Sequence, residues 1–276
     1  MEFPGVWVNT SQTLIYRVVP KCACSTIGQI LHFSDHGRFY DGDIHDAKDG
    51  LWKWNGNDDP QHARDIIVDT VTSRDAVTFT CVRNPYARVL SCFLDKIAGI
   101  QRNGKRYRGD MVAMIAEHYE MEIGETPEHE FDQVKAFRKF LLFVRDTIKF
   151  RHPMHPDIHW APMSGHVATL LNNGGTYDHV FPTEMFNDGM TGILGQVELA
   201  HGADLESLPR FNESEGHGPK RAHPIEDFFD DLAIHIVTDI YNKDFEVFGY
   251  SMEPGRSGPT DPIDVERVNS SLRRSH

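Results

Sequence analysis

The feature that most constrains this chain is a strand-like run that stops at a proline and is followed by a helix-like pattern. Residues 13–19 (TLIYRVV) are rich in β-branched and aromatic side chains, which favour a strand, and Pro20 ends the run. After the loop 21–26 (KCACST), apolar residues recur at the spacing of one helical face, at Ile27, Ile30, Leu31 and Phe33. The sequence therefore predicts a strand, a tight loop and a helix in succession.

A second unit of the same kind follows. Residues 76–82 (AVTFTCV) lead into Arg83-Asn84-Pro85, and apolar residues then recur at helical spacing as far as Ile97. A further strand is predicted at 177–181. Strands that alternate with helices indicate an α/β fold with a central, mainly parallel sheet flanked by helices, and ligands bind such sheets at the carboxyl ends of the strands. We therefore expect the loops after the first two strands to serve one site.

Other segments are predicted from composition and periodicity. Thr126-Pro127 has the pattern of an N-cap and a first helical residue, and an apolar helix face then runs from Phe131 to Ile148. Residues 34–65, rich in Gly, Asp and Asn, are predicted to form long ordered loops. Residues 225–243 are predicted to form one amphipathic helix, with five inward positions at Ile225, Phe229, Leu232, Ile236 and Ile240.

Composition excludes several classes of protein. The chain has 276 residues and carries 28 Lys and Arg against 41 Asp and Glu, a net charge of -13, so it has no general basic surface for a nucleic acid. Its four cysteines have neither the density of a secreted disulfide scaffold nor the spacing of a zinc site, so we expect reduced thiols and no metal.

The organisation of the chain is expected to be simple. It has no leader-like start and no run approaching the roughly 18 apolar residues of a membrane span, so we expect a soluble, cytoplasmic protein. We also expect a single domain over residues 1–252. Residues 253–276, rich in Pro, Gly and Ser, are expected to be a flexible tail.

The loop 21–26 has the composition of an anion site. A loop between a strand and a helix presents backbone N–H groups at the positive end of the helix dipole. Lys21 adds a full charge, and the other members are small or carry a hydroxyl: Cys22, Ala23, Cys24, Ser25 and Thr26. The pattern G-x-x-x-x-G-K-[ST] is absent, which counts against the alternative of a P-loop small-molecule kinase.

The second loop supplies groups for a phosphate monoester. Arg83 ends the strand, Pro85 turns the chain, and Ser91 follows about two helical turns later. An arginine fork with a nearby hydroxyl suits phosphate.

Both loops resemble motifs of the sulfotransferases. Residues 20–26 (PKCACST) look like the family's 5′-phosphosulfate loop, and residues 82–91 (VRNPYARVLS) look like its 3′-phosphate motif R-D-P-F-x-R-L-x-S, with Asn84 in place of the usual Asp. The form is similar to the carbohydrate sulfotransferase group (sulfotransferase family 2) that contains the chondroitin and HNK-1 enzymes, and to its soluble bacterial relatives. Three later stretches support the resemblance: HWAP at 159–162, YDHV at 177–180 with Glu184, and YNKDFEVFGY at 241–250.

The resemblance implies a P-loop-like sulfotransferase fold and an O-sulfation reaction without a metal. The donor would be 3′-phosphoadenylyl sulfate (PAPS), and adenosine 3′,5′-bisphosphate would be the product. Residues 21–26 would hold the 5′-phosphosulfate, and Arg83 and Ser91 the 3′-phosphate. An acceptor hydroxyl would attack sulfur in line, with Lys21 stabilising the charge on the leaving group. A relative that binds the bisphosphate without catalysis is the alternative outside the enzymes.

The attacking hydroxyl needs a general base. His45, in Asp43-Ile44-His45-Asp46 between the donor motifs, is the first candidate, because a flanking carboxylate orients an imidazole and raises its basicity. His159 and His62 are the other candidates, and the sequence does not decide among the three.

The acceptor is expected to be a saccharide, a glycolipid or a small metabolite, because an acidic protein repels a polyanionic acceptor. Three tryptophans suit a sugar ring or an apolar acceptor: Trp52, Trp54 and Trp160. Lys220-Arg221 is a candidate basic loop over the donor, and the basic run 102–108 is a candidate contact for an acidic acceptor.

Overall fold

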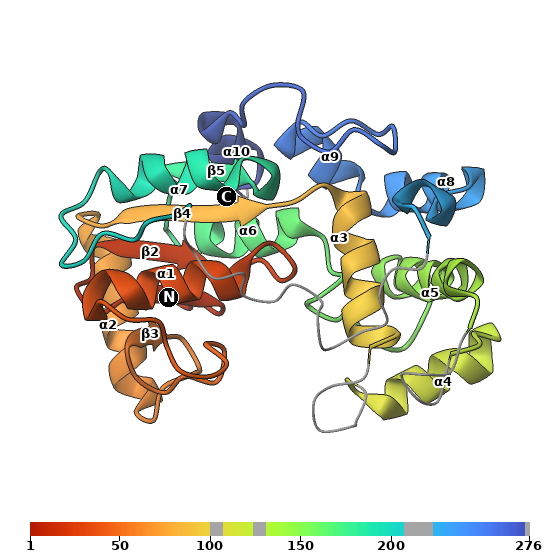
Figure 1. Cartoon of the computed structure of the whole chain (residues 1–276), viewed down its shortest axis with the longest axis horizontal. Helices are drawn as coiled ribbons and strands as arrows, with labels where there is room; N and C mark the ends of the chain where they lie inside the picture. The colour runs from red at the N-terminus through yellow and green to blue at the C-terminus, as the bar shows by residue number, and fades with distance from the viewer. Residues whose placement is uncertain (100–106, 124–130, 207–222, 274–276) are drawn as a thin grey trace.

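A five-stranded sheet organises the fold. The computed structural model describes residues 1–99, 107–123, 131–206 and 223–273. The strands lie in the order β3-β1-β2-β4-β5 (Figure 1). Their bounds are β1 Val6–Asn9, β2 Leu14–Arg17, β3 Leu51–Lys53, β4 Val77–Val82 and β5 His179–Pro182. With the helices around it, this sheet confirms the predicted α/β class.

The sheet is mixed rather than mainly parallel. β2, β4 and β5 are parallel neighbours, with Tyr16 opposite Phe79 and Phe79 opposite His179. β1 pairs antiparallel with β2, and β3 pairs antiparallel with β1. These two strands were not predicted, and β3, with three residues, is too short to show a clear period. The parallel part is the part that carries both predicted site loops.

The helices pack around the sheet and extend to one side of it (Figure 1). In the described residues they are α1 Cys24–His36, α2 Pro60–Ser73, α3 Pro85–Cys92, α4 Gly109–Tyr119, α5 Gln133–Ile148, α6 Met163–Asn172, α7 Phe186–Leu194, α8 Asp231–Ile240, α9 Asn242–Phe248 and α10 Val265–Ser271. A π-helical turn, Phe93–Ile97, continues α3, and short 3-10 turns lie at Thr183–Met185 and Ile225–Phe228. Figure 1 shows α3 leaving the end of β4, and Phe93 of the π turn that continues it packs on Phe137 and Phe140 of α5.

Two predicted segments differ in the structure. The segment 34–65 contains β3 and the start of α2, whose N-cap Asp59 accepts a hydrogen bond from the backbone N–H of His62. The segment 225–243 is a short turn, α8 and the start of α9 rather than one helix. Asp230 caps α8 and restarts the helical period, so Leu232 is 55% exposed instead of buried.

Two further segments of the prediction contain the helices α5 and α10. Thr126-Pro127 lies outside the described residues, and α5 begins at Gln133 after Asp132, whose side chain accepts from the backbone N–H of Lys135. The segment after Glu253 includes α10, which was not predicted. There Val268 is buried, and Asn269 exchanges hydrogen bonds with the backbone of Tyr177.

A buried arginine joins α3 to two loops. Arg88 donates through Nε to the carbonyl of Pro20 at 3.0 Å, and through its other nitrogens to the carbonyls of Ala161 at 2.8 Å and Ile158 at 3.4 Å. Its side chain is almost completely buried. Because all three contacts go to backbone carbonyls, this arginine, a residue of the 3′-phosphate motif in the sequence, is a structural clamp.

We predict that Arg88→Met lowers the free energy of unfolding by about 2–4 kcal/mol, since buried carbonyls left without a donor cost on the order of 1 kcal/mol or more each. Urea denaturation measures the change. Arg256→Met is the matched control, because the Arg256 side chain is exposed, and it should change stability by less than about 0.5 kcal/mol. Equal effects of the two substitutions would contradict the clamp.

Candidate functional site

The loop between β2 and α1 has an unusual backbone. Lys21 and Ala23 both adopt left-handed conformations, with φ of 69° and 57°, which is uncommon for residues other than glycine. Ala23 is the N-cap of α1, and no side chain caps this helix end. The first turn of α1 lies at the positive end of the helix dipole, where an anion is favoured.

Lys21 is held by a carboxylate from the end of α3. Its Nζ lies 2.9 Å from Oδ2 of Asp95, and Nζ of Lys96 lies 3.2 Å from the same oxygen. Burial alone would raise the pKa of Asp95, but the charges of Lys21 and Lys96 outweigh it and hold that pKa below its ordinary value. The predicted catalytic lysine thus has a built-in counter-ion.

The structure brings the second loop against the first. Arg83 follows β4, and its Nη1 donates to the backbone carbonyl of Lys21 at 3.3 Å. The two loops meet because β2 and β4 are adjacent parallel strands. Ser91 lies half-buried on α3, and no hydrogen bond joins it to Arg83 within the described residues.

Asn84, the departure from the usual motif, has a clear structural role. Its side-chain oxygen accepts from the backbone N–H of Tyr86 at 2.9 Å and caps α3. Its Nδ2 donates to the carbonyl of Arg256 at 2.8 Å, a bond that a carboxylate cannot make. The substitution keeps the helix cap and adds a contact to the segment after α9.

His45 faces the N-terminal turn of α1. Its Nε2 lies 2.9 Å from Oγ of Ser25 and 3.6 Å from Sγ of Cys24, and its ring packs edge-to-face on Trp7. Asp43 accepts from the backbone N–H of His45 at 2.9 Å and not from the ring. Asp43 therefore does not orient the imidazole as expected, although its charge helps to raise the pKa of His45.

Lys53 holds the loop that carries His45, and the sequence analysis did not single it out. This buried lysine donates to the carbonyls of Ile44, His45 and Ala47, and its ammonium lies 5.3 Å from the centroid of the Trp7 ring. Burial, with the charge of Lys48, lowers the pKa of Lys53 to about 8. A lysine between two tryptophans in a short strand was the only signal in the sequence.

The other candidate histidines differ in their surroundings. His159 lies 2.6 Å through Nδ1 from Oδ1 of Asp157, and this pair is mostly buried. His62 is exposed on α2 and packs edge-to-face on Trp52, on the β3 side of the molecule. Of the three candidates, only His159 has a carboxylate on its ring.

The cysteines of the loop point to different neighbours. All four cysteines are free thiols. Cys22 is buried, with its Sγ 3.7 Å from Sδ of Met163, whereas Sγ of Cys24 faces His45. Burial alone would raise the pKa of Cys24, but the hydrogen bond and charge of His45, and the charge of Lys21, lower it below its ordinary value. Burial raises the pKa of each of the other three thiols: Cys22, Cys81 and Cys92.

We predict that iodoacetamide at pH 7 labels Cys24 first, because its thiolate is favoured and accessible while the other thiols are buried and protonated. Peptide mass spectrometry measures the site and rate. His45→Gln should slow the labelling, since the thiol pKa then rises, and Cys24→Ser should remove it. Labelling of Cys81 or Cys92 at a similar rate in the folded protein would contradict this assignment.

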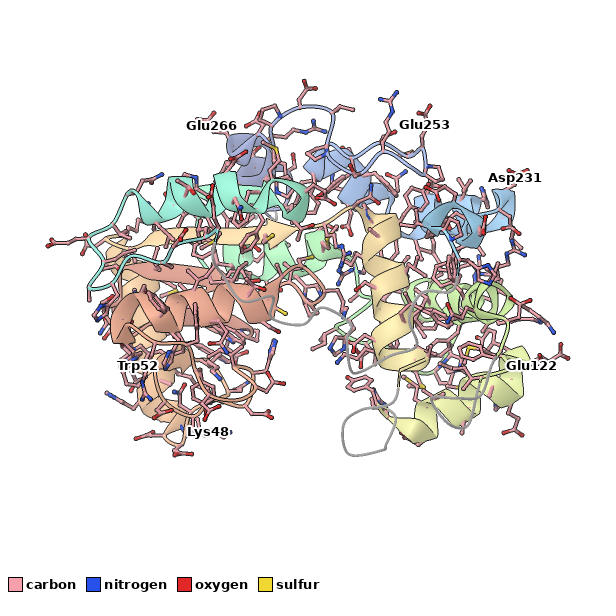
Figure 2. All side chains as sticks on the ribbon, in the orientation of Figure 1. Lys48, Trp52, Glu122, Asp231, Glu253 and Glu266 are labelled. Atoms are coloured by element: carbon pink, nitrogen blue, oxygen red, sulfur yellow. The ribbon has the colours of Figure 1, made fainter. Side chains whose placement is uncertain are left out.

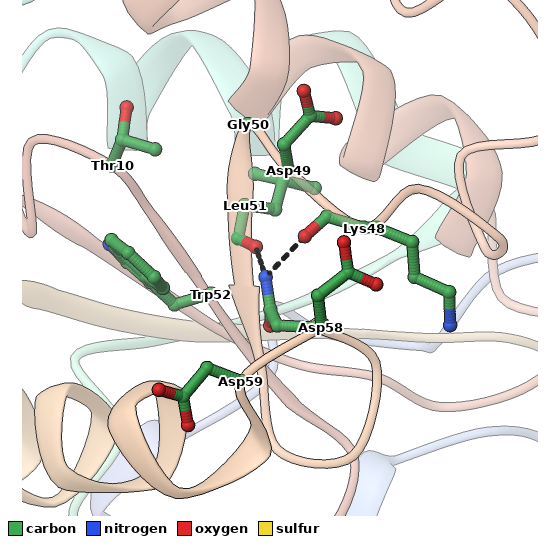
Figure 3. Close-up of a pocket in the computed structure, with 9 residues that line it drawn as sticks. Thr10, Lys48, Asp49, Gly50, Leu51, Trp52, Asp58 and Asp59 are labelled. Carbon is green, nitrogen blue, oxygen red and sulfur yellow. Dashed lines mark hydrogen bonds between the residues drawn. The ribbon is translucent and has the colours of Figure 1, made fainter.

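A cavity of about 180 Å³ lies beside β3 (Figure 3). Nine residues line it: Thr10, Lys48, Asp49, Gly50, Leu51, Trp52, Asn57, Asp58 and Asp59. Trp52 is the one of the three candidate tryptophans that lines it. Trp54 and Trp160 are buried, Trp54 against Phe3 and Trp160 between Phe140 and Phe143.

Several sequence candidates have no structural description. Lys220-Arg221 and residues 102–106 of the basic run lie outside the described residues. Within the described ranges, no three His, Cys, Asp or Glu side chains gather as metal ligands would. None of the helices described there is both long and apolar enough to cross a membrane.

Comparison with known families identifies this arrangement. A model of the sulfotransferase family matches residues 4–251, and the chain therefore belongs to the sulfotransferase family. The matched range includes both loops, α3 and the segment around His159. Comparisons with curated proteins and with solved structures give no significant match. Family membership supports sulfotransfer as the general activity.

Proposed function

We propose that this protein transfers a sulfuryl group from PAPS to a hydroxyl. The observation that carries the proposal is the meeting of two loops that each carry a cation, where Nη1 of Arg83 bonds to the carbonyl of Lys21 beside the start of α1. PAPS carries a phosphosulfate and a separate 3′-phosphate. In this proposal residues 21–26 hold the first group, and Arg83 with Ser91 holds the second.

The local charge supports an anionic donor in an acidic protein. Lys21, Lys96 and Arg83 gather near the start of α1, although the net charge of the chain is -13. Acidic side chains such as Glu122, Asp231, Glu253 and Glu266 project from the periphery (Figure 2). Clustered cations in an acidic surface favour a small, multiply charged anion over a long polyanion.

The chemistry follows from these positions. The acceptor oxygen attacks sulfur in line, and negative charge develops on the bridging oxygen that leaves with the 5′-phosphate. Lys21 and the first-turn N–H groups of α1 stabilise this charge. To stabilise this charge, Lys21 must leave its ion pair with Asp95 and pair with the donor instead. His45 contacts the donor loop through Nε2, which lies beside the hydroxyl of Ser25.

The acceptor in this proposal is a saccharide, a glycolipid or a small metabolite. An acidic surface weakens the approach of a sulfated or uronic acid polymer. The proposal includes a cytoplasmic location and a reaction that needs no metal.

Calorimetric titration with adenosine 3′,5′-bisphosphate tests the donor site without knowledge of the acceptor. We expect micromolar binding, about -8 kcal/mol, that is lost with 5′-AMP because the 3′-phosphate is missing. Preference for ATP with magnesium would replace the proposal by a kinase. Binding of the bisphosphate without any turnover of PAPS would leave a non-catalytic relative.

We predict different effects for the two cations. Lys21→Ala should lower turnover on the order of a hundredfold or more, because the leaving group loses its main charge partner. Arg83→Ala should mainly weaken bisphosphate binding. Lys243→Ala, on the exposed face of α9, is the control and should change neither quantity. Wild-type behaviour of both site variants would refute the assignment.

A further inference from the structure

One carboxylate fixes His159 in two ways. Oδ1 of Asp157 accepts from the backbone N–H of His159 at 3.0 Å and from its ring Nδ1 at 2.6 Å. Oδ2 accepts from the Tyr107 hydroxyl at 3.0 Å and lies 3.5 Å from Nη1 of Arg108. With both oxygens held, the carboxylate cannot turn, and the imidazole has one orientation.

The other ring nitrogen of His159 is free. Because Nδ1 donates to Asp157, the neutral ring carries a lone pair on Nε2, and no partner for Nε2 is present in the described part of the chain. Burial, together with the charges of Lys96 and Lys21, lowers the pKa of His159 more than the hydrogen bond and charge of Asp157 raise it. The pKa of Asp157 is about 2, since the hydrogen bonds of His159 and Tyr107 outweigh burial. At neutral pH the pair is thus a neutral imidazole on an ionised carboxylate.

This imidazole lies beside the donor loop. Arg88 bonds to the carbonyls of Pro20 and Ile158, which directly precede Lys21 and His159. The charges of Lys96 and Lys21 also help to lower the pKa of His159, as expected for near neighbours. The guanidinium of Arg88 therefore contacts the residue before Lys21 and the residue before His159.

Other histidines near the loop are already engaged. Nε2 of His45 contacts Ser25 and Cys24. Burial alone would lower the pKa of His45, but the hydrogen bond and charge of Cys24, together with the charge of Asp43, raise it above its ordinary value. Nε2 of His45 is thus already occupied by two side chains of the donor loop. Nε2 of His166 lies 2.9 Å from the carbonyl of Ile158, and its Nδ1 lies 3.5 Å from Nη2 of Arg17.

We propose that His159 is the catalytic base of the sulfuryl transfer and that Asp157 is its positioning residue. This inference rests on the proposed function. Nε2 of His159 takes the proton of the acceptor hydroxyl while the oxygen forms its bond to sulfur. The bond between sulfur and the 5′-phosphate oxygen breaks, and its electron pair leaves with the phosphate beside Lys21. The imidazolium then returns its proton to solvent, and no oxidant or reductant is needed.

The test uses the full chain with PAPS and water as the nucleophile, so that no acceptor has to be known. Release of ³⁵S-sulfate gives the rate, and calorimetry with adenosine 3′,5′-bisphosphate gives donor-site binding. We expect His159→Gln to lower the rate on the order of a hundredfold or more with binding unchanged. His235→Gln, at an exposed position of α8, is the matched control and should keep the wild-type rate.

The pH profile separates a base from a merely structural residue. The wild-type rate should fall on acidification through the lowered pKa of His159, with a limb below pH 6.5. Asp157→Asn removes the carboxylate that raises this pKa, so the limb should move to lower pH while the plateau rate drops at least tenfold. If Asp157 had a purely structural role, Asp157→Asn would lower the plateau rate but would not move the acidic limb to lower pH.

The outcomes distinguish the two proposals. A wild-type protein that does not bind the bisphosphate, or binds it and never releases sulfate, would overturn the sulfuryl transfer and this inference with it. Wild-type release that persists in His159→Gln would overturn His159 alone. If that variant does not fold, ¹⁵N NMR of the wild type decides: a proton on Nδ1 and none on Nε2 at pH 7 supports the assignment, and the opposite tautomer refutes it.

Discussion

The buried guanidinium of Arg88 determines how the loops of the site are arranged. A guanidinium is planar and directs its N–H donors at fixed angles, so the carbonyls that it binds cannot shift independently. Arg88 therefore holds the carbonyl of Pro20, which precedes the loop 21–26, close to the carbonyl of Ile158, which precedes His159. The same helix begins after Arg83 and leads at its other end to Asp95. α3 and the π-helical turn that continues it thus carry the clamp Arg88, the expected phosphate ligand Ser91 and the counter-ion Asp95 on one continuous helical segment.

The tripeptide Asp-Ile-His occurs twice in the chain, and its two copies show where sequence reasoning ends. In both, the aspartate accepts from the backbone N–H of the histidine two residues later, at 2.9 Å for Asp43 and 3.0 Å for Asp157. Only at His159 does the ring turn back to the carboxylate. His45 turns to the helix end instead, because that loop is held from the other side by Lys53. Tertiary contacts from distant residues decide the difference.

The helices and strands with a long apolar pattern in the sequence were the ones that could be predicted. The strand-loop-helix units that contain β2 with α1 and β4 with α3 repeat apolar residues over many positions, and both were found, together with the meeting of their loops. β3 has three residues and no period to detect. The misplaced Leu232 came from counting a period across the cap at Asp230, which restarts the helix. Local caps and short edge strands override periodicity.

The ion pair between Lys21 and Asp95 makes the carboxylate a tethered competitor of any anion that binds the loop. A tethered group acts at an effective concentration on the order of millimolar or higher, so Asp95 competes with the donor at every encounter. It competes equally with the bisphosphate product, whose phosphate occupies the same place in the proposed reaction. Affinity for the donor is therefore reduced by the same group that speeds departure of the product. Where product release limits turnover, a weaker donor site is the faster one.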